Sequence, residues 1–423
     1  MLSKSNIIFL VGMVLYSTSL RAESNLNTYT HTLKLRDAIA KTFEHNPMLR
    51  SFSYKLKAQA GKEFQAGLGA SPELSIMLDD AFGSNKFNSV DQAQTTLSIA
   101  WVIEGDIRQG YIDVASANTL ALNTEANIKR LDVASDTARL YLITLAHQSR
   151  LTNAIKTLEL AKQTVSAVKK RVATGKSPKA ELARAQAEFA RRELEKEDSE
   201  HEMSSAIHLL AAQWGDTNPA FTQVDGNLFS LPVIMPLKKL KTHLNKNPEF
   251  NRLLSVKRLK QAELLLAKAK SSPEWRVNFG VRHFEVSDDQ AIVAGISIPF
   301  GERSRNTGAI TEARANLSQT VAEEDALRVR FETTLFVLYQ ELLHSFHGVN
   351  TYRNKIIPRL EKALKETRRA YNLGRYSYLE WQSVQAELLE ARSALVEGSI
   401  DAHLKAIEIE RLTGTRMTQP TIK

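Results

Sequence analysis

The sequence predicts a mainly α-helical protein that also contributes strands to a transmembrane β-barrel. Three observations support this prediction. The chain repeats itself after roughly 200 residues, it contains two pairs of alternating apolar strands, and its helical stretches are far longer than those of ordinary globular domains. With 423 residues, of which 43% are apolar and 24% charged, the composition is that of a folded chain.

The N-terminus, "MLSKSNIIFLVGMVLYSTSLRAES", has a lysine before an apolar run and small residues after it. This pattern predicts a secretory signal peptide over residues 1–22, cleaved after Ala22. A membrane anchor is the alternative, but the run from Ile7 to Tyr16 is well below the ~20 apolar residues of a spanning helix. The absence of cysteine excludes a disulfide framework, thiolate chemistry and a lipidated cysteine.

The formal net charge of +9 would suit nucleic acid, but the stacking pattern of aromatic and basic residues is missing. We therefore expect no nucleic-acid partner. No phosphate-binding loop, H-E-x-x-H or G-x-S-x-G motif occurs, so we expect no enzyme activity and no cofactor.

An internal repeat is visible in "TGKSPKAELARAQAE" at 174–188 and "LGRYSYLEWQSVQAE" at 373–387. Both have a glycine, a glutamate six places later and then Gln-Ala-Glu, and the glycines are 199 residues apart (374 minus 175). An ordered series of such matches indicates duplication of one structural unit. We predict a first repeat at 23–215, a linker with three prolines at 216–236 and a second repeat at 237–423. Further matched pairs are Pro47 with Pro248 at 201 residues, Tyr141 with Tyr339 at 198, and Gly215 with Gly414 at 199.

Each repeat predicts the same order of elements. A first helix (35–69 and 237–270) precedes a β-hairpin, and a very long helix follows (107–174 and 307–373). At 1.5 Å per residue each long helix would reach roughly 100 Å. A return helix of about half that length then runs to Gly215 or Gly414.

The strands alternate between apolar and polar residues. In "WRVNFGVRHF", Trp275, Val277, Phe279 and Val281 alternate with residues that include Arg276, Asn278 and Arg282. The same alternation fits a transmembrane strand or a water-soluble hairpin with one buried face. Because four strands cannot close a barrel and open edges cannot face lipid, several chains must combine their strands. If the apolar face meets lipid, then Arg276, Asn278 and Arg282 face the pore.

The long helices carry only a narrow apolar stripe. In the first repeat it comprises Ile155, Leu158, Val165, Val168 and Val172. Such thin stripes cannot form a thick core, but they can pack neighbouring helices side by side in a tube.

These features together resemble the TolC-type outer-membrane efflux proteins. The resemblance rests on the duplicated unit, on an Asn-Pro early in each repeat, on "PFGERSRNTGAITEARA" after the fourth strand and on the Gly-centred helix tips. Within that family the chain is most similar to the heavy-metal branch of cobalt-zinc-cadmium and copper-silver efflux proteins. It departs from many members in lacking a lipidated cysteine.

The resemblance implies a homotrimer in which three chains form a shared twelve-stranded β-barrel in the outer membrane and an α-helical tunnel through the periplasm. It implies four contacts: sister chains, outer-membrane lipid, a periplasmic adaptor (membrane fusion) protein and an inner-membrane RND-type pump. Alternatives are a multidrug or type I secretion channel, or a periplasmic coiled-coil adaptor or scaffold.

The resemblance also implies that the two tips dock the adaptor and gate the tunnel. The residues concerned are Gly175, Lys176 and Ser177, and Gly374, Arg375 and Tyr376. Simple helix capping by the glycines is the alternative, and both roles are compatible. Glu181 and Glu380 lie further along, as either solvated charges or parts of a gate-locking ion-pair network with the neighbouring arginines and lysines.

Glu341, His344 and His347 stand at i, i+3 and i+6, so neighbouring pairs share a helix face. Nothing else in the sequence converges on them, and we expect ordinary helix histidines rather than a metal site.

Overall fold

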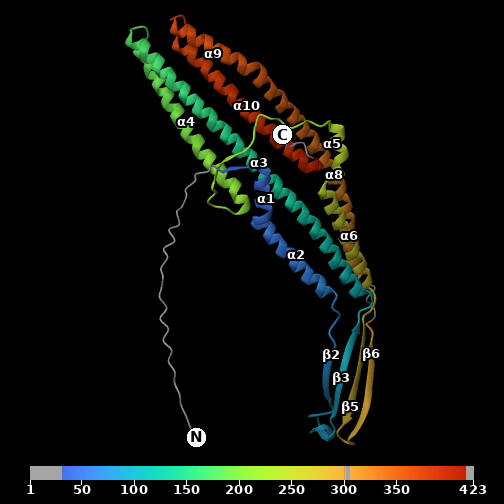
Figure 1. The fold of residues 1–423 in the computed structure, drawn as a ribbon. Helices are drawn as coiled ribbons and strands as arrows, with labels where there is room; N and C mark the ends of the chain where they lie inside the picture. The colour runs from blue at the N-terminus through green and yellow to red at the C-terminus, as the bar shows by residue number, and fades with distance from the viewer. Residues whose placement is uncertain (1–30, 300, 302–304, 416–423) are drawn as a thin grey trace, which may run out of the picture.

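The computed structural model describes residues 31–299, 301 and 305–415. Long helices form most of it, with a four-stranded antiparallel sheet at one end and the turns of two helical hairpins at the other (Figure 1). The predicted signal peptide, residues 1–22, lies outside the described part. Within that part, none of the helices combines the length and the apolar content that a membrane span requires.

The same order of elements occurs in both halves: two helices in tandem, a β-hairpin, a long helix and a return helix. The first half contains α1 (Leu35–His45), α2 (Pro47–Ala66), β2 (Glu73–Asp79), β3 (Gln94–Ile103), α3 (Asp106–Ala173) and α4 (Lys179–Ala211). The second contains α5 (Leu237–Leu244), α6 (Pro248–Ala269), β5 (Trp275–Phe284), β6 (Asp289–Ser297), α8 (Thr307–Thr351), α9 (Ile357–Asn372) and α10 (Tyr378–Thr413). Shorter elements are β1 (His31–Leu33), β4 (Phe221–Val224) and the 3-10 turns Asn85–Phe87 and Ala212–Trp214.

The predicted first helix of each half is in fact two helices, so that prediction was wrong in detail. The break falls before Pro47 and before Pro248. Proline lacks an N–H and pushes the preceding residue out of the helical region. Asn46 and Asn247 accordingly have extended backbones and cap the helices that follow.

Each of these asparagines also ties its helix pair to the end of a return helix. Asn46 Nδ2 donates to the Gln213 carbonyl at 2.7 Å, and Asn247 Nδ2 donates to the Leu412 carbonyl at 2.7 Å. The two halves therefore use the same side chain for the same connection.

The first long helix, α3, runs unbroken for 68 residues, in agreement with the predicted span of 107–174. The second does not: α8 and α9 are separated by the π-helical segment Tyr352–Ile356. A π turn holds one more residue per hydrogen-bonded ring than an α turn. The repeat offset grows by one residue, from 198 at Tyr339 to 199 at Gly374, across this segment. The π-helical segment thus accounts for the extra residue of the second half.

The predicted linker is more ordered than its prolines indicated. Its strand β4 pairs in parallel with β1, and this two-stranded sheet was not predicted. The Tyr141 hydroxyl of α3 lies 2.9 Å from the Leu33 carbonyl and 2.5 Å from the Asp225 carbonyl. On the other side, His403 Nε2 of α10 lies 2.9 Å from the Leu228 carbonyl. The linker is therefore bonded to helices of both halves.

Helix contacts along the bundle use small and aliphatic residues. Val168 is fully buried as predicted, but Ile155 is 49% exposed, and Ala161 and Thr164 are buried in the contact instead. Small side chains let helices approach closely, which suits thin layers of long helices.

The four-stranded sheet has the order β2-β3-β5-β6. Its register places Leu74 beside Ile99, Ile99 beside Phe279, and Phe279 beside Ala294. Residues directly opposite one another project from the same face. That face is apolar and exposed: Leu74 and Ile292 are each 72% accessible.

Candidate functional site: the two helical tips

The two tips are the turn between α3 and α4 and the turn between α9 and α10, and they lie side by side at the end of the molecule opposite the sheet (Figure 1). In the first, Gly175 has φ 71° and donates to the Val172 carbonyl at 3.0 Å, while Lys176 donates to the Arg171 carbonyl at 2.9 Å. This pair of hydrogen bonds is a Schellman motif, which requires a left-handed residue at the glycine.

The second tip repeats this geometry. Gly374 has φ 78° and donates to the Tyr371 carbonyl at 2.9 Å, and Arg375 donates to the Ala370 carbonyl at 2.9 Å. The shared sequence pattern therefore specifies the same turn twice.

The return helices start differently at the two tips. Ser377 forms a capping box with Glu380, whose carboxylate accepts from the Ser377 N–H at 2.7 Å. These hydrogen bonds from Ser377 lower the pKa of Glu380. At the first tip, Pro178 is the N-cap residue and makes no side-chain cap hydrogen bond, and Ser177 Oγ instead accepts from Arg171 Nε at 3.1 Å.

Arg171 joins the two tips. Its Nη1 donates to the carbonyls of Tyr371 at 2.6 Å and Asn372 at 3.1 Å, and its guanidinium lies 4.7 Å from the Tyr371 ring centre. The Tyr371 hydroxyl in turn donates to Glu181 Oε2 at 3.1 Å. A cation and an aromatic ring in this arrangement attract each other, and the carbonyls at a helix C-terminus favour positive charge.

A small apolar cluster supports this junction. It contains Val168, Ala185, Tyr371, Tyr378 and Trp381, all buried. The Tyr371 and Trp381 rings are 5.1 Å apart, and burial raises the pKa of Tyr378 to about 12. A packed cluster of uncharged side chains therefore supports the backbone of the tips.

The predicted tip residues divide by exposure. Lys176, Arg375, Tyr376 and Glu380 are exposed together with both glycines, whereas Ser177 and Glu181 are half-buried. Within the chain, the two glutamates make the hydrogen bonds given above. Sequence reasoning did not single out Tyr371 or Trp381, although aromatic residues within two turns of Gly374 were a signal that the first tip lacks.

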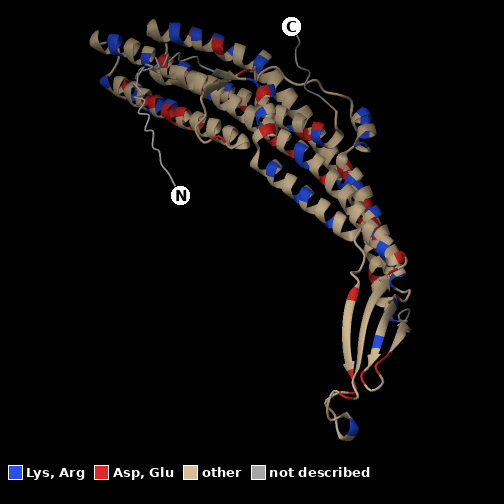
Figure 2. Ribbon diagram, turned by 60° about the horizontal axis from the view of Figure 1, so that its bottom comes forward, with Lys and Arg blue, Asp and Glu red and all other residues tan. Residues whose placement is uncertain are grey.

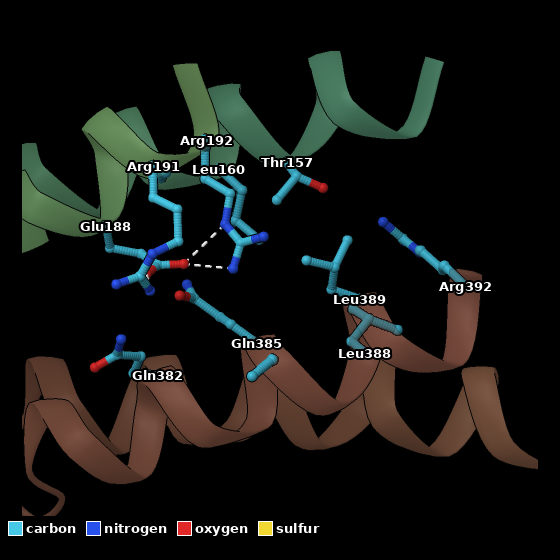
Figure 3. A pocket seen from close by; sticks show the side chains of 12 residues that line it. Thr157, Leu160, Glu188, Arg191, Arg192, Gln382, Gln385, Leu388, Leu389 and Arg392 are labelled. Atoms are coloured by element: carbon cyan, nitrogen blue, oxygen red, sulfur yellow. Dashed lines mark hydrogen bonds and ion pairs between the residues drawn. The ribbon is translucent and has the colours of Figure 1, made fainter. Parts of the chain in front are cut away.

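Further from the turns, a groove lies between the two hairpins (Figure 3). Its charges are compensated: Arg192 pairs with Glu188 and with Glu195, and Arg392 pairs with Glu361 at 2.8 Å. Gln385 Nε2 crosses the groove to Thr164 Oγ1 at 3.0 Å. The pairs of Arg192 lie within α4 and the pair of Arg392 joins α10 to α9, so they leave little free charge inside the groove. The Gln385 hydrogen bond links the two hairpins.

The predicted polar face of β5 also has defined partners. Arg276 Nη1 lies 2.6 Å from Glu73 of β2, and Arg282 Nε donates to Thr96 Oγ1 of β3 at 2.9 Å. Asn278 fills the space beside Gly295, where an added Cβ would lie 2.5 Å from Asn278 Oδ1. These three side chains alternate with Val277, Phe279 and Val281 on the strand, so they lie on the face opposite the apolar one.

The Glu341, His344 and His347 group does not form a metal site in the structure. Glu341 lies 2.6 Å from Lys405 Nζ of α10. Across the described ranges, no three His, Cys, Asp or Glu side chains are grouped to hold an ion.

Comparison with known proteins finds similar sequences and similar folds. Residues 38–216 match the family model for outer membrane efflux proteins. The chain is 24% identical over 383 residues to the cobalt-zinc-cadmium resistance protein CzcC of Cupriavidus metallidurans, with 90% of each chain covered. It is also 24% identical over 291 residues to the nickel-cobalt-cadmium resistance protein NccC of Alcaligenes xylosoxydans xylosoxydans, covering 67% of this chain and 65% of that protein.

The fold is similar to that of the outer membrane protein VceC from Vibrio cholerae. The TM-score is 0.73 at 18% identity, with 91% of this chain and 97% of that chain covered. The fold class predicted from the sequence is confirmed by this similarity.

Proposed function

Because this chain belongs to the outer membrane efflux protein family, we propose that it is the outer-membrane channel of a three-part system that exports heavy-metal cations. The observation that carries the proposal is the position of a sheet with an exposed apolar face at one end of helices that reach roughly 100 Å. The apolar face of the sheet can contact membrane lipid, and helices of this length can cross the periplasm.

Three copies of the chain complete the channel. The edge strands β2 and β6 have one neighbour each within the chain, and an open edge is not stable in lipid. Three four-stranded sheets joined edge to edge form a twelve-stranded barrel, which lies within the size range of membrane barrels. Its outer surface carries Phe279 and Ile296, and its lumen carries Arg276, Asn278 and Arg282.

The tips form the periplasmic end of the tunnel. In this arrangement the Gly175 and Gly374 turns of three chains alternate around one ring and contact a periplasmic adaptor, which links them to an inner-membrane pump. The rigid Schellman turns and the Arg171 contacts support this role, because a docking surface gains affinity when its backbone is already ordered.

The substrate class comes from the relatives. CzcC and NccC are cobalt-zinc-cadmium and nickel-cobalt-cadmium resistance proteins. We expect the channel itself to pass cations without tight ligands, because strong coordination would slow release.

Two measurements test the proposal. Deleting the chain should lower tolerance to zinc, cobalt and cadmium, and the full-length chain supplied in trans should restore it. Unchanged metal tolerance with lowered tolerance to organic dyes would favour a multidrug channel. Separately, the detergent-extracted protein should migrate as a trimer that boiling dissociates, whereas a water-soluble monomer would contradict the channel.

A further inference from the structure

A groove lies where the helices meet the sheet, between the end of α2 and the start of α3. It is lined by Lys62, Gln65, Leu68, Glu104, Arg108 and Tyr111. Strand β2 begins at Glu73 and β3 ends at Ile103, so the groove lies within a few residues of the apolar sheet (Figure 1). In Figure 2 the sheet is mostly tan, and charged ribbon becomes frequent where the helices begin.

Two tryptophans mark this end of the sheet as the membrane boundary. Trp101 and Trp275 are 44% and 47% exposed. Trp101 lies beside Val277 and Trp275 lies beside Ile103, so both belong to the apolar face. Tryptophan is enriched where the hydrocarbon of a membrane meets the headgroups. The groove follows directly after this boundary and is therefore at the level of the lipid headgroups.

Three cations surround the groove. Lys62 and Arg108 are exposed, and neither makes a salt bridge or a side-chain hydrogen bond with another described residue. Lys270 of α6 lies 4.8 Å from the ring centre of Tyr111. A Cβ added at Gly69 would lie 2.7 Å from Arg108 Nη1, so the glycine leaves room for the guanidinium. The groove thus presents positive charge that the chain itself does not neutralise.

The neighbouring carboxylates have other partners. Glu104 Oε1 accepts from the Ala70 N–H at 3.1 Å. Glu263, which lines an adjoining groove together with Lys62, pairs with Lys260 at 2.9 Å. Three cations against the one carboxylate of the groove leave a net charge of +2, which favours an anionic ligand.

The second half of the chain closes the corresponding position. At an offset of 198 residues Arg108 corresponds to Asn306, and at an offset of 201 Lys62 corresponds to Glu263. Asn306 Nδ2 donates to the Ala267 carbonyl at the end of α6. The cations are therefore not required by the repeated packing of the fold, and they indicate a ligand that only the first half binds.

We propose that this groove binds one anionic phospholipid from the periplasmic leaflet of the outer membrane. Lys62 and Arg108 hold the phosphate by charge-assisted hydrogen bonds, and an acyl chain runs over Leu68 toward the sheet. The inference rests on the proposed function, because the membrane position of the sheet is what brings lipid to the groove.

A lipid fits the groove better than a free anion does. Leu68 is 51% exposed, and the apolar surface continues to Leu74 and Ile76, each 72% exposed. Inorganic phosphate would leave these side chains in water, whereas a phospholipid covers them and also pairs with the cations.

The test uses the full-length protein, purified as trimers in detergent and freed of lipid. Native mass spectrometry counts the phosphatidylglycerol molecules that each trimer retains as this lipid is added. Diacylglycerol, which has the chains without the phosphate, tests the apolar part of the ligand alone. Inorganic phosphate, added as a competitor, tests the anion alone.

We expect each chain of the trimer to retain one phosphatidylglycerol, with no retention of diacylglycerol and no displacement by inorganic phosphate. The variant Lys62→Gln, Arg108→Gln should raise the Kd for phosphatidylglycerol about tenfold or more, because each basic side chain contributes to holding the headgroup. The matched control Lys57→Gln, Lys268→Gln removes two other exposed lysines, from α2 and α6, and should leave the Kd nearly unchanged. Heat-dissociable trimers of both variants in membrane fractions show that they assemble.

Equal affinity of the two variants, displacement of the lipid by inorganic phosphate, or equal retention of diacylglycerol would overturn the proposal. Dissociation of lipid-free trimers in the Lys62→Gln, Arg108→Gln variant alone would also overturn it, because the cations would then pair with a neighbouring copy of the chain. The diacylglycerol and phosphate measurements on the wild type need no variant. Failure of the proposed function is distinct, since it is scored by metal tolerance and by absence of the wild-type trimer.

Discussion

Arg171 of the first tip donates to the main-chain carbonyl of Tyr371 in the second tip at 2.6 Å, across 200 residues of sequence. The same guanidinium reaches the Lys176 carbonyl at 3.2 Å and Ser177 Oγ at 3.1 Å within its own tip. One side chain therefore satisfies acceptors of both turns, and the two hairpins end at a fixed separation.

Replacing Arg171 with leucine should let the tips separate. The change removes several charge-assisted hydrogen bonds, and we expect a local loss of about 1–2 kcal/mol. Lysine at this position should not restore the wild-type state, because an ammonium cannot reproduce the fork of the guanidinium. The chain has no natural cysteine, so spin labels at Thr174→Cys and Leu373→Cys can report the distance between the tips directly.

We expect a longer and broader distance distribution in Arg171→Leu and in Arg171→Lys. Lys170→Leu is the matched control, since Lys170 is exposed and adjacent. An unchanged distribution in both Arg171 variants would show that the hairpins are held by packing alone.

Gly374→Val should abolish docking and efflux while trimers remain in the membrane. The left-handed conformation at φ 78° costs a β-branched residue about 1–2 kcal/mol or more, so the turn should rearrange. Gly175→Val imposes the same backbone strain at φ 71°, and we expect a weaker effect because "TGKSP" keeps less of the shared tip pattern. If both variants keep full efflux and normal cross-linking to an adaptor, the two glycines act only as helix caps and do not contribute to docking.

The sequence was sufficient to predict most of the fold because its strongest signals are local. Strand alternation and the Gly-centred turns each reflect one element and its own periodicity, and the 199-residue repeat shows the same local patterns a second time. The breaks before Pro47 and Pro248 were also local, and their positions follow from proline chemistry that the continuous-helix prediction ignored.

Other features depend on contacts between distant segments, which no local pattern encodes. The pairing of β1 with β4 joins residues about 190 positions apart, His31 with Phe221. The bond between Arg171 and Tyr371 requires both hairpins to be in place first. In the sequence, the π-helical segment appears only as a change of one residue in the repeat offset. The structure explains this change, because the π-helical segment holds the extra residue.

The two faces of β5 should respond differently to charge. Val277 lies beside Trp101 and Ile296 on the apolar face, so Val277→Lys should hinder assembly at a cost of about 2–4 kcal/mol near a bilayer midplane. Asn278→Lys places the same charge on the opposite face and should be tolerated. The measurement is the yield of heat-dissociable trimers in outer-membrane fractions, and equal losses in the two variants would mean that the apolar face does not meet lipid.

The buried side chain of His403 should make the stability of the protein depend on pH. The side chain is 7% exposed and its Nε2 lies 2.9 Å from the Leu228 carbonyl of the linker. Burial lowers the pKa of His403 from its ordinary value of 6.5. Below pH 6.5 the His403 side chain binds a proton in the unfolded chain but stays neutral in the folded chain, so the free energy of unfolding falls as the pH drops toward the lowered pKa. Above pH 6.5 His403 is neutral in both the folded and the unfolded chain, so its titration no longer lowers the free energy of unfolding.

His403→Gln removes this titration and keeps an N–H donor for the Leu228 carbonyl. We expect wild-type protein to lose thermal stability between pH 8 and pH 5, with the variant losing less over the same interval although it starts lower because glutamine fills the site imperfectly. His208→Gln is the control, because His208 is exposed on α4 and its ring nitrogen bonds only locally, to the Ser204 carbonyl. If His403→Gln and wild type show the same change in melting temperature between the two pH values, the contact between α10 and the linker does not depend on the charge of this histidine.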